Sequence, residues 1–381
     1  MPHSEVRALF SNHFDQTPDL VVTAPARVNL IGEHTDYNGG FVFPAAIDRG
    51  MYVAAKLVSG PTHLYSRQAR EGAPFDAPTV LPGTLRGWER YPAGVAWALS
   101  QRGHSVPNVE AVVDSDIPMG SGVSSSAAIE LAFGVLYNAA SHLGLPLEML
   151  ARLGQIAENQ FVGVNCGIMD QMASAMGKAG KAMFLDTRSL DIQYAPIPEG
   201  VAIVLCDTKK PRALSDSAYN ERRSQCEEAS RILGVPMLRD ADMAILEAAK
   251  DRMSEVVYRR ARHVISENDR CIHFKEALEQ SDLPRAGALM RGSHESLRDD
   301  YEVSCMELDV MADAAAAAPG CIGARMTGAG FGGACVALVH EEAVAAFEKA
   351  TLAAYAVSAG RDGEAMACRI VDGAHVIQTL L

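Results

Sequence analysis

Four polar side chains crowd one short stretch near the start of the chain. Residues 26–40 read ARVNLIGEHTDYNGG and carry Arg27, Glu33, His34 and Asp36 between an apolar strand pattern and turn residues. Carboxylates and arginines avoid burial unless they are paired or bound to something, so packing explains this density poorly. A polar loop with surface ion pairs is one interpretation, and a site that binds a polyol is the other.

A stretch rich in glycine and serine, residues 118–126 (PMGSGVSSS), stands immediately before a predicted helix. Glycine lets the backbone approach a phosphate, and the N–H groups and dipole of a helix start favour its negative charge. A serine hydroxyl at this place can also ligate Mg²⁺. The stretch lacks the GK[ST] ending of a Walker A loop. It is therefore interpreted as a phosphate loop of another type, or as an ordinary serine-rich helix cap.

The hexamer GAGFGG at residues 328–333 matches GxGxxG, but its context rejects a dinucleotide-binding site. That fingerprint follows a strand and opens a helix, whereas ACVALV, which reads as a strand, comes next here. Protein kinases also have a glycine loop before a strand, but the accompanying HRD and DFG segments are missing from this sequence. The hexamer is interpreted as flexible backbone that meets a ligand or a neighbouring domain, or as a tight turn.

Two further segments carry single candidate groups. NCGIMDQ (residues 165–171) places Asp170 in an apolar context after a helix that carries Glu158. Such an acid is either a buried cap or a functional group in a perturbed environment. SAYNERRSQC (residues 217–226) places Tyr219 and two arginines at a predicted helix start, where an exposed basic face is the simpler interpretation.

Several elements must converge to bring these segments together. The chain has 381 residues, more than one core usually supports, so we expect two domains with a ligand cleft between them. The mixture of strands and helices predicts a two-domain α+β architecture. We place the N-terminal domain at residues 1–190. The C-terminal domain, at residues 191–381, is expected to hold a helical region, the glycine hexamer and ferredoxin-like βα elements.

Sequence patterns predict the order of these elements. The first 70 residues read mainly as strands divided by Gly, Pro, Asn and Asp, and a helix begins near Pro92. Two helices follow, one after the serine-rich loop and one at residues 146–161. We expect a long helical region at about residues 217–317, a helix at residues 341–360, and one final strand at residues 366–377.

The formal net charge of -13 argues against binding to nucleic acid or to an anionic membrane, since both require a basic surface. No run approaches the roughly 18 apolar residues that span a bilayer, and MPHSEVRALFSNHF at the N-terminus has no signal-peptide pattern. We therefore expect a cytoplasmic protein. No coiled-coil heptads are present, which favours a monomer.

The eight cysteines form no CxxC pair and no close Cys/His cluster. In a chain of this length without a secretion signal, this pattern predicts reduced residues in or near the core, not a disulfide framework or a zinc site. Cys166 is the exception to watch, because it belongs to the NCGIMDQ segment.

Taken together, these segments resemble galactokinases, of the superfamily of galacto-, homoserine, mevalonate and phosphomevalonate kinases. The resemblance covers nearly the whole chain, with the motifs in the same order and at similar spacing. ARVNLIGEHTDYNGG and the tyrosine-bearing helix are specific to galactokinases and close sugar-kinase relatives, while the phosphate loop and RMTGAGFGGACVALV are shared across the superfamily. The implied reaction is transfer of the ATP γ-phosphate to α-D-galactose, giving galactose 1-phosphate and ADP, with Mg²⁺.

The resemblance also implies a role for each candidate residue. Asp170 is implied to be the catalytic carboxylate that faces the anomeric hydroxyl, with Arg27 as its cationic partner. The implied sugar-contacting positions are Glu33, His34, Asp36, Gly167 and Tyr219. The implied ligands of Mg²⁺ are Ser125 and Glu158. The implied phosphate loop and nucleotide site comprise Gly120, Gly122, Ser124, Ser125, Ser126, Trp88, Tyr91, Gly328, Gly330 and Gly332.

The sequence departs from the family pattern at a few positions. Ala26 stands where Gly is common, Val123 stands where Leu is usual, and Pro211 with Arg212 lies in a variable segment. These are backbone or packing neighbours, so they bear on fine positioning more than on the reaction.

Two alternatives remain at this point. Kinases for related sugars, such as N-acetylgalactosamine or arabinose, share most of these motifs. A non-catalytic sensor that binds galactose and ATP would keep the binding residues, although an intact phosphate loop and Asp170 count against it.

Overall fold

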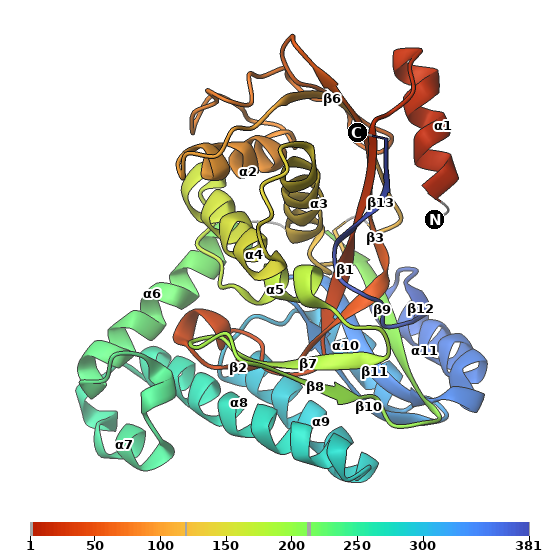
Figure 1. Cartoon of the computed structure of the whole chain (residues 1–381). Coiled ribbons are helices and arrows are strands. Elements are labelled where there is room, and N and C mark those ends of the chain that lie inside the picture. Colours follow the sequence, from red (N-terminus) through yellow and green to blue (C-terminus); the bar gives the residue numbers. More distant parts are fainter. Residues whose placement is uncertain (1–2, 119, 212–214, 381) are drawn as a thin grey trace.

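Three β-sheets form the framework of the molecule (Figure 1). The computed structural model describes residues 3–118, 120–211 and 215–380. The largest sheet has six strands in the order β13-β1-β3-β6-β4-β5. These strands are β1 (Leu20–Asn29), β3 (Pro44–Val58), β4 (His63–Ser66), β5 (Arg70–Glu71), β6 (Asn108–Ser115) and β13 (His375–Thr379).

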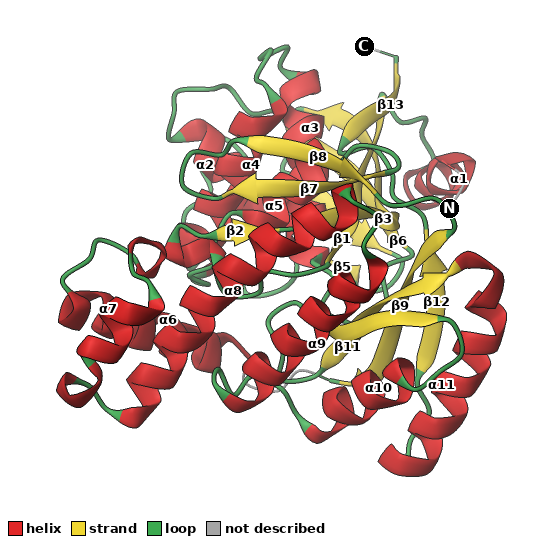
Figure 2. Cartoon of the chain, turned by 90° about the horizontal axis from the view of Figure 1, so that it is seen from below, coloured by secondary structure: helices red, strands yellow, loops and turns green. Residues whose placement is uncertain are grey.

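Helices cover both faces of the six-stranded sheet. On one face, Val6 and Phe10 of α1 (His3–Phe14) join a small apolar cluster with sheet residues such as Val21. The other face is covered by helices that enclose the main N-terminal core (Figure 2). These helices are α2 (Arg90–Ser100), α3 (Ser125–Ala140), α4 (Leu147–Ile156) and α5 (Met169–Met176).

The second sheet is antiparallel, with the order β10-β11-β9-β12, and it is buried on both faces. Alternate residues of its central strands enter two different cores, because successive side chains of a strand point to opposite faces. Its strands are β9 (Val201–Lys210), β10 (Cys321–Thr327), β11 (Gly333–His340) and β12 (Glu364–Cys368). The helices of this half are α6 (Ser215–Leu233), α7 (Met243–Ala248), α8 (Glu255–Glu279), α9 (Leu283–Asp299), α10 (Met306–Ala316) and α11 (Val344–Ala359).

One apolar core joins the two halves of the molecule. It combines Val28 and Ile31 from the end of β1 with Val336 of β11 and Phe274 of α8. A small sheet of β2 (Phe41–Val42), β7 (Lys181–Asp186) and β8 (Ile192–Pro196) lies beside this core. Because the end of β1 is packed from both sides, the polar loop that follows it is held in a fixed place.

A β-bulge sets the direction of Arg27. The pairing of β1 with β3 shifts register between Pro25 and Ala26, and Arg27 follows immediately. A bulge bends the strand and re-aims the next side chain, which explains why these devices occur beside functional sites. The Arg27 N–H then donates to the carbonyl of Val123, which ties β1 to the loop before α3.

The predicted α+β class and the helical region at about residues 217–317 are confirmed. Among the first 70 residues, which were expected to be mainly strands, residues 3–14 form α1 and residues 44–58 form the one long strand β3. One expectation is wrong: the single final strand predicted at residues 366–377 is two strands in different sheets. Gly373 marks the break between these two strands, because a Cβ there would lie 2.0 Å from the Ala175 carbonyl oxygen.

The domain division between residues 190 and 191 stays a prediction. Two pairings cross it: β8 pairs with β7, and β13 from the end of the chain pairs with β1. The eight cysteines are all free, as expected. Pro211 is described, whereas Arg212 lies outside the described residues. Across the described part of the chain, the helices are too short or too polar to cross a bilayer.

Candidate active site

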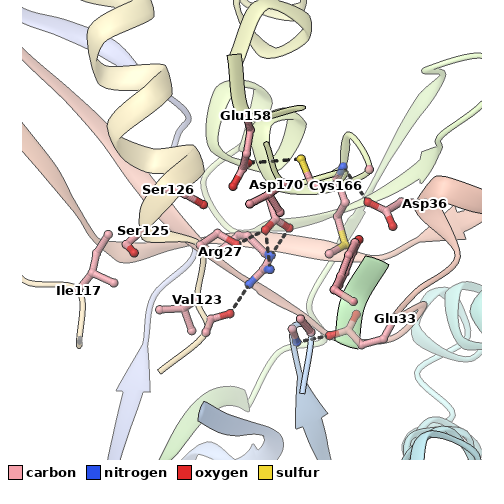
Figure 3. A pocket seen from close by; sticks show the side chains of 18 of the residues that line it. Arg27, Glu33, Asp36, Ile117, Val123, Ser125, Ser126, Glu158, Cys166 and Asp170 are labelled. Atoms are coloured by element: carbon pink, nitrogen blue, oxygen red, sulfur yellow. Dashed lines mark hydrogen bonds and ion pairs between the residues drawn. The ribbon is translucent and has the colours of Figure 1, made fainter. Parts of the chain in front are cut away.

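A cavity of about 270 Å³ lies where the end of β1, the loop before α3 and the start of α5 meet (Figure 3). Most of the residues selected from the sequence line it. They are Arg27, Glu33, His34, Asp36, Tyr91, Gly120, Gly122, Ser124, Ser125, Ser126, Glu158, Gly167, Asp170, Tyr219 and Gly328. Trp88, Gly330 and Gly332 are not among the lining residues.

An ion pair between Arg27 and Asp170 stands in the cavity wall (Figure 3). Arg27 Nε donates to Asp170 Oδ1 at 2.7 Å, and Nη2 donates to Oδ2 at 2.8 Å, so the pair is bidentate. Burial opposes the charge on Arg27, but the neighbouring carboxylates of Asp170, Glu33 and Asp36 outweigh it and raise the pKa of Arg27. The two side chains are 143 positions apart in sequence, and the fold brings them into direct contact.

Ser124 supports the same carboxylate from an unusual backbone conformation. Its φ of 63° lies in the left-handed region, which costs energy for a residue other than glycine. Ser124 is the N-cap of α3, but its side chain makes no capping hydrogen bond. Its hydroxyl donates instead to Asp170 Oδ2. For Ser124, the helix-cap interpretation is therefore wrong.

Asp36 and Gly167 fit together closely on the neighbouring wall. A Cβ at Gly167 would lie 1.9 Å from Asp36 Oδ2, so any side chain there would displace the carboxylate. The Met169 N–H donates to Asp36 Oδ2 at 3.4 Å. Burial, together with the charge of Asp170, raises the pKa of Asp36 to about 6. Gly167 thus serves by leaving room for Asp36.

Glu33 is buried and links the polar loop to the glycine hexamer. Its carboxylate accepts from Asn29 Nδ2 and from the Gly328 N–H, and Arg325 Nη1 lies 3.7 Å from Oε1. Burial raises the pKa of Glu33 to about 7, against the opposing charges of Arg325 and Arg27. Arg325, from β10, is fully buried and did not stand out from the sequence.

His34 and Tyr219 form an aromatic part of the wall. Their ring centroids are 5.5 Å apart, and Tyr219 comes from α6. His34 Nε2 lies 3.2 Å from the Ala329 carbonyl oxygen, and Nδ1 lies 2.8 Å from the Tyr37 hydroxyl. Burial, with the neighbouring His263 and the positive groups Arg222 and Arg325, lowers the pKa of His34 to about 3. The imidazole is therefore neutral at physiological pH.

Glu158 stands on a π-helical turn (Ala157–Val162) that continues α4, a distortion often found at functional sites. Gln171 Nε2 donates to Glu158 Oε2 at 2.7 Å and to Glu130 Oε2 at 3.0 Å. Burial and the charge of Asp170 raise the pKa of Glu158 to about 7, and burial raises the pKa of Glu130 well above its usual range. Among the residues that the structure describes, no arginine or lysine pairs with either carboxyl group.

This arrangement fits a hydrated cation. Within residues 3–118, 120–211 and 215–380, no three His, Cys, Asp or Glu side chains are grouped to hold a metal ion by themselves. Mg²⁺ usually takes only one or two carboxylates and completes its shell with water and substrate phosphates. Glu158 and the hydroxyls of Ser125 and Ser126 can supply such a partial set, and Ser126 already hydrogen-bonds to Glu158.

The two glycine-rich segments differ in what surrounds them. Gly120 has φ +75° and nothing within 4 Å of a Cβ position, so this backbone is open to a ligand. In the hexamer, a Cβ at Gly330 would lie 2.2 Å from the Val303 carbonyl oxygen, and one at Gly332 would lie 2.8 Å from the Lys210 carbonyl oxygen. These two glycines make room for protein backbone and do not line the cavity, so their implied place in the nucleotide site stays a prediction.

Trp88 lies outside the cavity, packed against the N-terminal core, whereas Tyr91 lines it. The indole Nε1 of Trp88 is buried and has no hydrogen-bond partner among the described residues. Of the further lining residues, Val123 and Cys166 had drawn comment at the sequence level. The others were not selected, because nothing in an apolar side chain or a backbone carbonyl signals a ligand; they are Ile117, Pro118, Val164, Met169 and Ala329.

Chemically, the cavity offers three sets of groups that are adjacent in space. Asp170, held by Arg27, is a proton or hydrogen-bond acceptor. Asp36, Glu33 and His34 are suited to the hydroxyls of a polyol. The start of α3, with its serines and the open glycine loop, is suited to a phosphate.

Comparison with known proteins gives matches along the chain. Residues 8–57 match the galactokinase galactose-binding signature, residues 90–178 the N-terminal domain of GHMP kinases, and residues 274–356 their C-terminal domain. A galactokinase of Chloroflexus aggregans is 44% identical over 371 residues, which cover 96% of this chain and 95% of that protein. A galactokinase of Roseiflexus sp. (strain RS-1) is 42% identical over 374 residues, covering 97% and 96%.

Solved structures give the same result at the level of the fold. Lactococcus lactis galactokinase, solved in complex with galactose, has a TM-score of 0.92 and 36% identity, with 99% of each chain covered. Methanococcus jannaschii mevalonate kinase has a TM-score of 0.65 at 19% identity, covering 93% of this chain and 99% of that one, and so shares the fold.

Proposed function

The chain belongs to the galactokinase family, and from this premise we propose how its cavity carries out the reaction. α-D-Galactose binds with its anomeric hydroxyl beside Asp170, and the γ-phosphate of ATP is transferred to that oxygen. The observation that carries the proposal is the bidentate Arg27–Asp170 pair, which faces the same cavity as the serines at the start of α3. A reacting hydroxyl and a bound phosphate can meet there.

The residues around the C1 hydroxyl mainly align the reacting groups and neutralise negative charge. In phosphoryl transfer the transition state is loose, so positioning and charge stabilisation matter more than a strong base. The new bond joins the C1 oxygen to the γ-phosphorus, and the bond to the ADP oxygen breaks. Asp170 orients the hydroxyl and receives its proton late in the transfer, while Arg27 pairs with the carboxylate and offsets negative charge.

The remaining hydroxyls of the sugar are read by fixed groups of the wall. Asp36 and Glu33 accept hydrogen bonds, His34 contributes a neutral ring, and Tyr219 covers the sugar from α6. Buried polar groups that must find partners reject a sugar whose hydroxyl points elsewhere far more strongly than an apolar pocket does. Gly167 contributes by leaving Asp36 its place.

ATP is held at the start of α3, where Gly120 leaves the backbone accessible and the helix dipole favours phosphate. Mg²⁺ bound there would neutralise phosphate charge. Glu158, with Ser125 and Ser126, would hold that ion, and Gln171 would keep the Glu158 carboxylate oriented. Tyr91 stands beside the nucleotide half of the cavity.

A coupled ADP assay tests the proposal directly. Galactose, glucose, N-acetylgalactosamine and arabinose are compared at equal concentration with ATP and Mg²⁺, and we expect turnover to be fastest with galactose. Faster turnover of another sugar would assign the enzyme to a related kinase. Tight binding of galactose and ATP in calorimetry without ADP release would support a sensor and overturn the catalytic proposal.

We also propose a cytoplasmic monomer with no nucleic-acid or membrane partner. The formal net charge of -13 supports the expected lack of a nucleic-acid or membrane partner, because nucleic acids and anionic lipid surfaces repel such a chain. Light scattering at enzyme concentrations used for assays tests the oligomeric state.

A further inference from the structure

A chain of four polar groups, of which His34, Tyr301 and Cys226 are buried and Tyr37 is partly buried, runs from the cavity wall into the protein. His34 Nδ1 lies 2.8 Å from the Tyr37 hydroxyl, which lies 2.6 Å from the Tyr301 hydroxyl, which lies 3.1 Å from Cys226 Sγ. Tyr301 and Cys226 are almost fully buried. Of these four residues, His34 alone lines the cavity, where Ala329 is also a lining residue.

The direction of the hydrogen bonds in this chain follows from its outer end. His34 Nε2 lies 3.2 Å from the Ala329 carbonyl oxygen, and a carbonyl can only accept. Nε2 must therefore carry the hydrogen. A neutral imidazole has one N–H, so Nδ1 must accept, and the Tyr37 hydroxyl must donate to it.

The same logic fixes the rest of the chain. Because the Tyr37 hydrogen points to His34, its oxygen accepts from the Tyr301 hydroxyl, and the Tyr301 oxygen accepts from the Cys226 thiol. Each group donates once, toward the cavity. The opposite direction would place the lone pair of Nε2 against the Ala329 carbonyl and leave both without a hydrogen.

The electrostatic surroundings keep the imidazole in its neutral form. Burial, with the neighbouring His263 and the positive groups Arg222 and Arg325, lowers the pKa of His34 to about 3. Burial also raises the pKa of Tyr37 and that of Tyr301 well above the usual range, so both hydroxyls keep their hydrogens.

We propose that Tyr37, backed by Tyr301, is a positioning residue that locks His34 in the tautomer with its hydrogen on Nε2. The inference rests on the proposed function for its consequence. With this tautomer, the His34 Nε2–H donates to the Ala329 carbonyl in the unliganded wall. On binding, a single sugar hydroxyl can insert between the two groups: it accepts the Nε2 hydrogen in place of the carbonyl and donates its own hydrogen to that carbonyl. With the other tautomer, the wall would present two acceptors, and one hydroxyl has only one hydrogen to give.

Nitrogen-15 spectroscopy of the unliganded enzyme tests the lock without any need for activity. The chain has 11 histidines, so the protein is labelled at histidine and the His34 signals are identified by their loss in His34→Gln. We expect Nε2 to have the shift of a protonated ring nitrogen and Nδ1 that of an unprotonated one. A protonated Nδ1 in the wild-type spectrum would overturn the proposal.

Tyr37→Phe removes the donor to Nδ1 and keeps the ring. We expect the other His34 tautomer to become populated and the galactose Kd to rise about tenfold, the scale of one lost hydrogen bond between neutral groups. The KM for ATP should stay unchanged, and kcat should change by less than about twofold, because Tyr37 touches neither the nucleotide nor the reacting atoms. An unchanged tautomer and galactose Kd would sink the proposal.

Tyr301→Phe acts one step further away and leaves the Tyr37 hydroxyl free to donate to His34. Its effect on galactose Kd should be about twofold, smaller than that of Tyr37→Phe. Tyr65→Phe is the matched control, because that hydroxyl accepts from Arg70 outside the cavity and its loss should change neither the His34 spectrum nor galactose binding.

The failure of this proposal and that of the proposed function are distinguishable. An enzyme that does not phosphorylate galactose but has the Nε2–H tautomer would refute the function and leave the lock intact. An active enzyme whose His34 carries its hydrogen on Nδ1 would refute the lock alone. If Tyr37→Phe does not fold, the wild-type spectrum and Tyr301→Phe still decide.

Discussion

The two sides of the cavity treat negative charge differently. We name the two sides after the ligands proposed for them. The proposed sugar side comprises Arg27, Glu33, His34, Asp36, Gly167 and Asp170, and the proposed nucleotide side comprises Gly120, Ser124, Ser125, Ser126 and Glu158 with Glu130 and Gln171 behind it. On the sugar side, Asp170 has a bidentate arginine partner. On the nucleotide side, Glu158 and Glu130 share one amide of Gln171, and the described residues around them supply no arginine or lysine partner.

The backbone follows the same division. Gly167 leaves room for the Asp36 carboxylate and for no side chain of its own, so the position of that carboxylate in the sugar side is set by the protein itself. Gly120 has nothing within 4 Å of its Cβ position, so the nucleotide side is open. Under the proposed assignment, sugar specificity and the neutralisation of phosphate charge belong to different walls of the cavity. The sugar side is preformed, and we expect a cation and phosphates to complete the nucleotide side.

Asp170→Asn is the substitution with the largest expected effect, and it tests the sugar side. The change keeps the shape of the side chain but removes the acceptor for the C1 proton and the charge opposite Arg27. We expect kcat to fall at least about 10²-fold and up to about 10⁴-fold, the range for a lost proton acceptor, with a nearly unchanged galactose Kd. Steady-state kinetics and calorimetry measure the two quantities.

Asp240→Asn is the matched control for this change. Asp240 also forms a bidentate pair, with Arg188 at 2.8 Å for both bonds, but it does not line the cavity. Its kcat should stay at the wild-type level. Near-normal kcat in Asp170→Asn would remove Asp170 from the reaction and leave the Arg27 pair a structural feature.

Glu158→Gln tests the nucleotide side. The amide keeps the contact with Gln171 but loses the charge that a cation needs. We expect the apparent affinity for Mg²⁺, measured from the rate at fixed ATP, to fall about 10- to 100-fold. Galactose Kd should not change. Glu148→Gln, on the exposed face of α4, is the control.

Glu158→Gln should weaken Mg²⁺ binding but stabilise the fold. Burial makes the charged form of Glu158 unfavourable in the folded protein, and the amide carries no charge. We therefore expect Glu158→Gln to melt at a higher temperature than the wild type at pH 8, while binding Mg²⁺ more weakly. A variant with unchanged Mg²⁺ dependence would show that the cation is held elsewhere.

Gly167→Ala tests how tightly the sugar side is preformed. The new Cβ would lie 1.9 Å from Asp36 Oδ2, so the carboxylate must move away from its hydrogen bond with Met169. We expect the galactose KM to rise about tenfold, with the KM for ATP unchanged, as for a displaced hydrogen-bond acceptor. Gly292→Ala is the control, because its Cβ would meet only Arg270 Cδ at 3.8 Å. An unchanged galactose KM would mean that Asp36 does not read the sugar.

Much of the sugar side could be predicted from the sequence. Carboxylates and an arginine in a short stretch indicated a polar site, and the resemblance joined Arg27 to Asp170 across 143 positions. The α+β fold class followed from ordinary strand and helix patterns in the sequence. These features depend on residue type and spacing, which the sequence displays.

Other features depend on what lies beside a residue, and the sequence does not display that. Gly330 and Gly332 look like Gly120, but only the fold reveals backbone carbonyls against them. Arg325 gives no sign of its burial beside Glu33. Glu130 could have been found, because it is the one acid in the otherwise apolar helix α3, where a buried charge needs a reason.

The smallest expected effect is the pH dependence of the stability difference between the wild type and Glu158→Gln. Burial and the charge of Asp170 raise the pKa of Glu158 from 4.5 to about 7, so the fold binds this proton more tightly than the unfolded chain does. That stabilisation is complete below the unfolded pKa of 4.5 and is lost as the pH rises through about 7.

The amide introduced by Glu158→Gln does not titrate, so the variant should exceed the wild type in Tm by a margin that is small near about pH 5 and largest above about pH 8. The histidines do not disturb the comparison: His34 and His263, whose pKa values burial lowers to about 3 and about 4, titrate equally in both proteins and cancel in the difference. Differential scanning calorimetry across this range measures the margin. A margin that shrinks as the pH rises would mean that Glu158 is ionised in a stabilising pair, and the contrast between the two sides of the cavity would then disappear.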